Sequence, residues 1–147
     1  MKIRCSLILL LLLSCDPYNK TPNTINTSIS EEIELEPALK KSIALGKEVY
    51  SSFCITCHLP NGKGVSQVFP PLAKSDYLMN KRQASIKAIK YGQSGKITVN
   101  GKHYNNVMSS LGLEDAEIAH VMNYITNSWG NSNNKLITEE EVSKIEP

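Results

Sequence analysis

The chain has 147 residues, which is enough for one small domain with appended segments. Hydrophobic residues make up 41% of it and aromatic residues only 6%, so a core built from side chains alone would be modest. The formal net charge of +2 is too small to indicate a nucleic-acid partner.

Residues 1–14 predict an export signal. Lys2 and Arg4 precede an apolar run over residues 7–13, far shorter than the roughly 20 residues of a membrane-crossing helix. The run ends in LLSC, which resembles the bacterial lipobox, whose cysteine becomes the acylated first residue of the mature chain. We therefore expect a lipid anchor on Cys15. A plain secretory signal, or an uncleaved one with a free Cys15, is the alternative.

Residues 15–36 predict a flexible tether between a membrane and the domain. The segment is rich in Asn, Thr, Ser and Pro, and such a composition buries too little apolar surface to fold alone. A coil of this length would span roughly 25 Å on average.

Helical periodicity begins at Pro37, a residue suited to the first position of a helix. Apolar residues then recur three and four positions apart and form one face. This face contains Leu39, Ile43, Val49, Tyr50 and Phe53, with Gly46 among them. Glycine costs a helix about 1 kcal/mol relative to alanine. Gly46 therefore predicts a very close second helix, unless it is a tolerated surface glycine.

Further elements follow in chain order. After a loop rich in Pro and Gly, Asn80 is placed to cap a helix that runs to about Tyr91. The pair Asn100-Gly101 predicts the two-residue turn of a β-hairpin. A helix is expected over 115–128, and a capping box predicts a short one over 138–145.

The sequence CITCH, residues 54–58, carries the most chemical information. On a helical turn Cys54, Cys57 and His58 project from the same side. Two thiols one turn apart can bond the two vinyl groups of a haem, and the imidazole can bind its iron, so the pattern is the signature of c-type haem attachment. A disulfide, a zinc site and a thioredoxin-like motif are the alternatives. His103 and His120 offer no second ligand pair for zinc.

Five stretches together make the chain resemble the mono-haem class I cytochromes c, in a bacterial lipoprotein-anchored form. They are GKEVYSSFCITCH, NGKG, FPPL, ITVNGKHYNNVM and LEDAEIAHVMNYITNSWGN. The resemblance covers residues 37–131 and implies an all-α cytochrome c fold. Four or five helices would surround one covalent haem c, with a small β-hairpin before the loop of the axial methionine. Residues 132–147 would form a C-terminal tail with a short helix.

The resemblance also implies specific contacts. The helix over 37–53 would cross the helix over 115–128 at Gly46, with Tyr50 and Tyr124 as contacts. The carbonyl of Pro70 would accept a hydrogen bond from the ring of His58 and fix its orientation. Trp129 would either cover part of the haem or be an ordinary core aromatic.

A low-spin electron carrier needs a second axial ligand opposite His58. The resemblance places Met108 there, in the loop after the hairpin. His103 and His120 are expected at the surface, because each lies away from the apolar face of its element. The remaining two candidates, Met79 and Met122, are expected to pack in the core. Many relatives carry a proline directly after the axial methionine, and Ser109 stands there instead.

The expected function is one-electron transfer outside the cytoplasm, on the periplasmic side, without enzyme activity or a small-molecule substrate. Its partner would be a dehydrogenase, a reductase or an oxidase, and the lipid on Cys15 would hold it at a membrane. A haem-based sensor or weak peroxidase with a displaceable sixth ligand is one alternative, and a fixed subunit of a membrane complex is another. Basic residues between Lys74 and Lys102 predict either a docking patch for an acidic partner or an ordinary solvated surface.

Overall fold

The computed structural model describes the backbone of residues 24–147 and the side chains of residues 36–147. The predicted export signal, Cys15 and the first part of the predicted tether lie outside the described residues. Within the described part of the chain, no helix is both long and apolar enough to cross a membrane.

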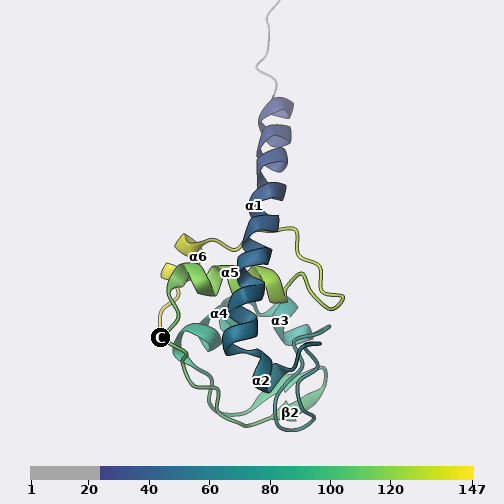
Figure 1. Cartoon of the computed structure of the whole chain (residues 1–147), viewed down its shortest axis with the longest axis vertical. Helices are drawn as coiled ribbons and strands as arrows, with labels where there is room; N and C mark the ends of the chain where they lie inside the picture. The colour runs from purple at the N-terminus through teal and green to yellow at the C-terminus, as the bar shows by residue number, and fades with distance from the viewer. Residues whose placement is uncertain (1–23) are drawn as a thin grey trace, which may run out of the picture.

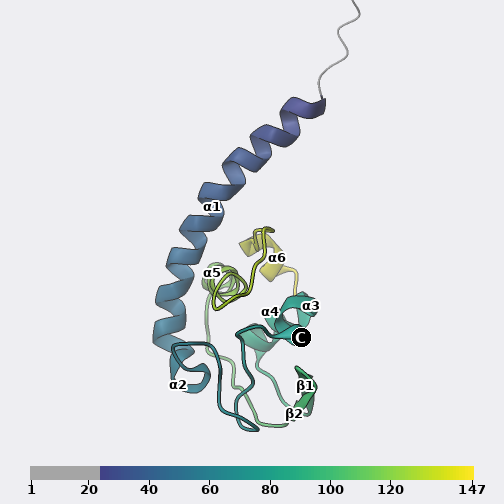
Figure 2. The ribbon, with the colours of Figure 1, turned by 90° about the vertical axis from the view of Figure 1, so that its right-hand side faces the viewer.

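The first helix, α1, runs from Thr24 to Phe53 and extends well beyond the rest of the molecule (Figure 1). The predicted start at Pro37 was therefore wrong, and residues 24–36 are helical where a coil was expected. Pro37 lies inside the helix, although proline lacks the N–H that an interior position uses. The preceding SEEIELE supplies Glu and Leu, which favour helix. Figure 2 shows α1 curving past the domain, with its N-terminal end projecting from it.

The remaining elements are short, and the fold is helical with one small hairpin, as predicted. They are α2 (Ile55–His58), α3 (Asp76–Asn80), α4 (Arg82–Tyr91), β1 (Ile97–Val99), β2 (Lys102–Tyr104), α5 (Asp115–Ile125) and α6 (Glu139–Ser143). The described residues thus form six helices, where four or five were expected. In the hairpin Thr98 pairs with His103, and both turn residues, Asn100 and Gly101, have positive φ.

The predicted cap at Asn80 was wrong. Asn80 is the last residue of α3, whose own cap is Ser75, and α4 begins only at Arg82. The Ser75 hydroxyl accepts a hydrogen bond from the backbone N–H of Leu78 at 3.1 Å. Two short helices therefore replace the one expected helix. The reason is that Ser75, five positions before Asn80, caps a helix of its own where we expected a loop.

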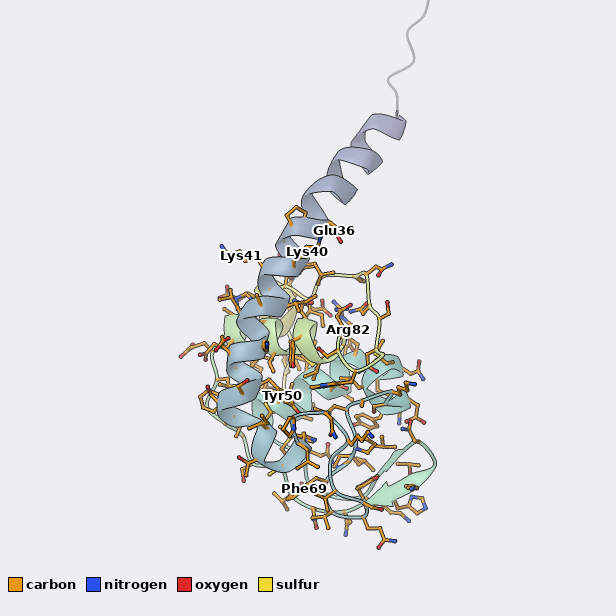
Figure 3. The ribbon with its side chains drawn as sticks, turned by 45° about the vertical axis from the view of Figure 1, so that its right-hand side comes forward. Glu36, Lys40, Lys41, Tyr50, Phe69 and Arg82 are labelled. Carbon is orange, nitrogen blue, oxygen red and sulfur yellow. The ribbon has the colours of Figure 1, made fainter. Side chains whose placement is uncertain are left out.

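The crossing of α1 and α5 forms the centre of the fold. A Cβ built on Gly46 would lie 1.9 Å from the carbonyl oxygen of His120 and 2.8 Å from Cβ of Tyr124. The predicted close approach at Gly46 is confirmed. The aromatic ring of Tyr50, on the same face of α1, lies 5.4 Å from that of Tyr124 and is almost fully buried (Figure 3). The helix α5 ends at Ile125, three residues before the predicted end.

The C-terminal segment, residues 132–147, packs into the core rather than hanging from the domain. Ile137 and Val142 are buried. The buried amide of Asn123 on α5 hydrogen-bonds both backbone groups of Ile137, its Nδ2 donating to the carbonyl at 2.8 Å and its Oδ1 accepting from the N–H at 2.9 Å. The predicted cap is present, because the Thr138 hydroxyl accepts a hydrogen bond from the N–H of Glu141. The boundary predicted at residue 131 therefore separates two parts of one packed unit.

Candidate haem-binding site

The CITCH sequence forms the tight turn that the chemistry requires. The helix α1 ends at Phe53, Cys54 caps α2, and the N–H groups of Cys57 and His58 donate to the Cys54 carbonyl at 3.2 and 2.9 Å. Leu59 then leaves the helix with φ +64°. Cys54 and Cys57 are both free thiols, so no disulfide joins them in the structure. Burial raises the pKa of Cys54 to about 11, with a further contribution from Cys57.

A cavity of about 350 Å³ lies beside this turn. Cys54, Cys57 and His58 line one side of it. The other walls come from the loop over 68–75, α3, α4, the hairpin, the loop over 106–111 and α5, and most of their side chains are apolar. Among the residues that the structure describes, no lysine, arginine, aspartate or glutamate lines it. Two thiols, an imidazole and apolar walls in one cavity fit a flat, largely hydrocarbon group that binds a metal at its centre.

His58 is held in one orientation by the backbone. Its side chain is buried, with 9% exposed, and Nδ1 lies 3.1 Å from the carbonyl oxygen of Pro70, as the resemblance implied. Because a carbonyl can only accept, Nδ1 carries the proton and donates it. Burial lowers the pKa of His58, and the Pro70 carbonyl opposes this in part. The neutral ring therefore has a lone pair on Nε2 for a metal.

Gly64 makes this contact possible. Its N–H donates to the carbonyl of His58 at 3.0 Å. A Cβ on Gly64 would lie 2.3 Å from the carbonyl oxygen of Phe69 and 2.6 Å from that of Pro70. Its φ of +61° is also unfavourable for other residues. The sequence NGKG thus owes its second glycine to the approach of the chain that carries Pro70.

Met108 lines the same cavity as His58. Its backbone forms two hydrogen bonds with Gln93. The N–H of Gln93 donates to the Met108 carbonyl at 2.8 Å, and the N–H of Met108 donates to the Gln93 carbonyl at 2.9 Å. Gly92 precedes this contact with φ +89°, and a Cβ there would lie 2.8 Å from the Met108 carbonyl oxygen. The loop is therefore fixed against the end of α4. Ser109, which follows Met108, is exposed.

The other candidate axial ligands do not line the cavity. Met122 is fully buried in the core, and His103 is exposed on the hairpin, both as predicted. Met79 is half-buried on α3. The prediction of a solvated His120 was wrong: its Nδ1 lies 2.8 Å from the hydroxyl of Ser42 on α1. The helix α1 crosses α5 so closely that it covers His120 as well as the apolar face of α5.

Trp129 packs beside the site rather than over it. Its ring lies 5.0 Å from that of Tyr50 and 5.4 Å from that of Tyr124. Its Nε1 donates to the carbonyl of Pro60 at 3.1 Å. Trp129 is absent from the lining of the cavity, so it is a core aromatic that supports the loop after His58. A Cβ on Gly62 would lie 2.4 Å from its ring.

Two of the basic residues between Lys74 and Lys102 form contacts within the fold. Arg82 forms a two-pronged ion pair with Glu141 and faces the C-terminal segment (Figure 3). Lys90 bonds Asp115 at 2.9 Å and the carbonyl of Val142 at 2.9 Å. The hydrogen bond to Asp115 is the main reason that the pKa of Lys90 is raised. The exposed remainder are Lys74, Lys81, Lys87, Lys96 and Lys102.

Apolar side chains are exposed where the cavity meets the surface. Phe53, Val68 and Val107 all line the cavity. Their exposed fractions are 47%, 38% and 69%, respectively. Sequence reasoning did not single out Val68 or Val107. It also missed Ser85, which lies one helical turn before the cavity residues Ala88 and Ile89 and shares their face of α4.

The cytochrome c family model matches residues 43–129 of the chain. The chain is 40% identical over 109 residues to cytochrome c-552 of Thermus thermophilus. That match covers 68% of this chain and 82% of the Thermus protein. It is 29% identical over 132 residues to the cytochrome c subunit of the quinone alcohol dehydrogenase of Gluconacetobacter polyoxogenes. That match covers 87% of this chain but only 26% of the subunit.

Proposed function

The chain belongs to the cytochrome c family of electron carriers, and from that premise we propose that His58 and Met108 are the two axial ligands of its haem. The observation that carries the proposal is that both side chains line one cavity beside the two thiols. The other histidines and methionines considered do not line it.

The chain's own residues supply binding and orientation. Cys54 and Cys57 would each add their S–H across one vinyl group of the haem, the sulfur bonding one vinyl carbon and the hydrogen the other, and the two thioether bonds would prevent loss of the haem. The Pro70 carbonyl accepts from Nδ1 of His58, which fixes the ring and leaves Nε2 free to bind iron. Met108 would supply a neutral thioether, which would raise the potential of the iron relative to a histidine ligand. The bound haem supplies the one-electron couple between Fe(III) and Fe(II).

This ligand set favours electron transfer over catalysis. If His58 and Met108 fill both axial positions, no coordination site would remain for a substrate. The loop that carries Met108 forms two backbone bonds to Gln93, just beyond the end of α4. It is also tied to α4 itself by the hydroxyl of Ser110, which donates to the Lys90 carbonyl at 2.8 Å. These contacts offset the missing proline at Ser109, so we favour the carrier over a sensor or weak peroxidase.

The experiment is Met108→Ala in the haem-loaded protein, with Met79→Leu as the matched control. Met108→Ala should abolish the methionine-to-iron absorption band and lower the midpoint potential, whereas Met79→Leu should leave both unchanged. Survival of the band in Met108→Ala would show that another residue is the ligand. Rapid carbon monoxide binding by the reduced wild-type protein would favour the sensor or peroxidase.

We also propose that the protein works outside the cytoplasm, anchored by lipid at Cys15. The support is the charged and apolar leader followed by LLSC. Mass spectrometry of the mature N-terminus tests it. A diacylated Cys15 supports the anchor, and an unmodified chain that still begins at Met1 contradicts it.

The proposed partner is an oxidoreductase that docks where the cavity meets the surface. The support is the exposed apolar group of Phe53, Val68 and Val107 and the name of the dehydrogenase subunit to which the chain is similar. Co-purification from native membranes, before and after Val107→Asp, tests the docking face. Unchanged recovery of the same oxidoreductase with Val107→Asp would place the contact elsewhere.

A further inference from the structure

The hydroxyl of Ser85 is buried in the wall of the cavity without a hydrogen-bond partner. Only 7% of Ser85 is exposed. Among the described residues, its Oγ is the single buried side-chain oxygen or nitrogen that forms no hydrogen bond. Native proteins rarely leave such a group unpaired. The position suggests that its partner belongs to whatever fills the cavity.

Some other serines among the described residues donate their hydroxyl to the carbonyl of the residue four positions earlier. Ser51 donates to the carbonyl of Lys47 at 2.9 Å, and Ser128 donates to that of Tyr124 at 2.7 Å. Ser85 has the equivalent carbonyl, that of Lys81, which accepts its backbone N–H at 2.9 Å. Its hydroxyl does not use this carbonyl. Ser85 is therefore unusual within its own fold and not only against a general rule.

We propose that Ser85 Oγ donates a hydrogen bond to a carboxylate of the haem. The inference rests on the haem occupying this cavity but not on the identity of the sixth ligand. Apart from its two carboxylates the edge of a haem is mainly hydrocarbon, and its ring nitrogens bind the iron. Because none of the described lysine, arginine, aspartate or glutamate side chains lines the cavity, a carboxylate that enters it depends on neutral donors such as this hydroxyl.

The thioether of Met108 is a less suitable acceptor. The backbone of Met108 is fixed against Gln93, beyond the C-terminal end of α4. Ser85 lies in the first turn of that helix, six residues before Tyr91, or about 9 Å along the axis. Ser75, another serine in the cavity wall, already uses its oxygen to cap α3. Ser109 also lines the cavity but is exposed. Ser85 is thus the buried serine of the wall whose hydroxyl forms no hydrogen bond with the described residues.

A hydrogen bond to a carboxylate favours its ionised form and lowers its pKa. Removal of the bond should raise the pKa of that carboxyl group. Ionisation of a carboxyl near the iron stabilises Fe(III), so the midpoint potential falls with rising pH through this pKa. In Ser85→Ala the fall should therefore occur at higher pH than in the wild type.

The test is redox titration of haem-loaded wild type, Ser85→Ala and Ser85→Thr across pH, with Ser128→Ala as the control. Ser85→Ala should shift the pH profile upward and lower the melting temperature. Ser85→Thr keeps the hydroxyl and should restore the wild-type profile, and Ser128→Ala should match the wild type throughout.

Two results would overturn the proposal. A Ser85→Ala profile that superimposes on the wild-type profile, with a higher melting temperature, would mean that the hydroxyl stays unpaired in the loaded protein. An unchanged profile with an altered methionine-to-iron band would identify Met108 sulfur as the acceptor. If Met108 is not the sixth ligand, the result is different: the methionine-to-iron band is absent from the wild type.

Discussion

The α-carbon of Gly46 faces the carbonyl oxygen of His120 so closely that a Cβ would lie 1.9 Å from it. The contact is with backbone, which cannot rotate away as a side chain can. Gly46→Ala should therefore destabilise the protein by more than about 2 kcal/mol, despite the better helix propensity of alanine.

Urea unfolding of the haem-loaded protein measures this loss. Ala44→Gly is the control, because Ala44 is exposed two positions away on α1 and its replacement should cost only about 1 kcal/mol of propensity. Equal or greater stability of Gly46→Ala would mean that the two helices are farther apart.

The C-terminal segment should be required for stability. A chain that ends at Asn131 loses the burial of Ile137 and Val142 and leaves the amide of Asn123 without its two partners. Together these losses should cost about 4 kcal/mol or more. A chain that ends at Ile145 keeps all of these contacts and should melt like the full chain. Equal melting of both truncated chains would show that residues 132–145 add nothing.

The pair of Arg82 and Glu141 should make stability depend on pH. The hydrogen bond from Arg82 is the main reason that the pKa of Glu141 is lowered in the folded state. A carboxyl with a lowered folded pKa stabilises the protein above its unfolded pKa of about 4.3, and this contribution is lost as pH falls through the folded value. Both groups are partly exposed, so the contribution at neutral pH should be about 1 kcal/mol.

Unfolding free energies from pH 7 to pH 3 of wild type and Glu141→Gln test this pair. The variant should be less stable at pH 7, and the difference should shrink on acidification. Glu140→Gln is the control, because Glu140 pairs with Lys144 at the exposed surface. A difference between wild type and Glu141→Gln that stays constant with pH would contradict the prediction.

The exposed lysines of the hairpin region should steer anionic oxidants. Lys96 and Lys102 are both exposed. Lys96 precedes β1, whose Ile97 and Val99 line the cavity, and Lys102 begins β2 opposite Val99. Oxidation of the reduced protein by hexacyanoferrate(III) should slow as ionic strength rises, and the double change of both lysines to Glu should slow it severalfold at low salt. Lys47→Glu, on the exposed side of α1, is the control. A rate that does not change with salt would exclude steering.

Local sequence patterns predicted the parts of the site that are close in the chain. The turn from Cys54 to His58 and the hairpin at Asn100-Gly101 follow from spacing and turn residues, and Gly46 followed from its place on an apolar face. The contact between His58 and Pro70 came from the family resemblance.

Contacts between distant segments could not be read in this way. His120 appeared solvated because periodicity identifies the apolar face of α5 but not the width of the surface that α1 covers. Ile137 appeared to lie in a tail because its partner, Asn123, is a polar residue that periodicity does not mark as core. Ser85 stayed unnoticed for a related reason, since a serine on a helix is ordinary until its missing partner is known.

Iron X-ray absorption of the oxidised, haem-loaded protein tests the ligation by His58 and Met108 most directly. We expect five nitrogen neighbours and one sulfur neighbour for the iron in the wild type, with the sulfur absent in Met108→Ala. Six nitrogen neighbours, or a sulfur neighbour that remains in Met108→Ala, would contradict it.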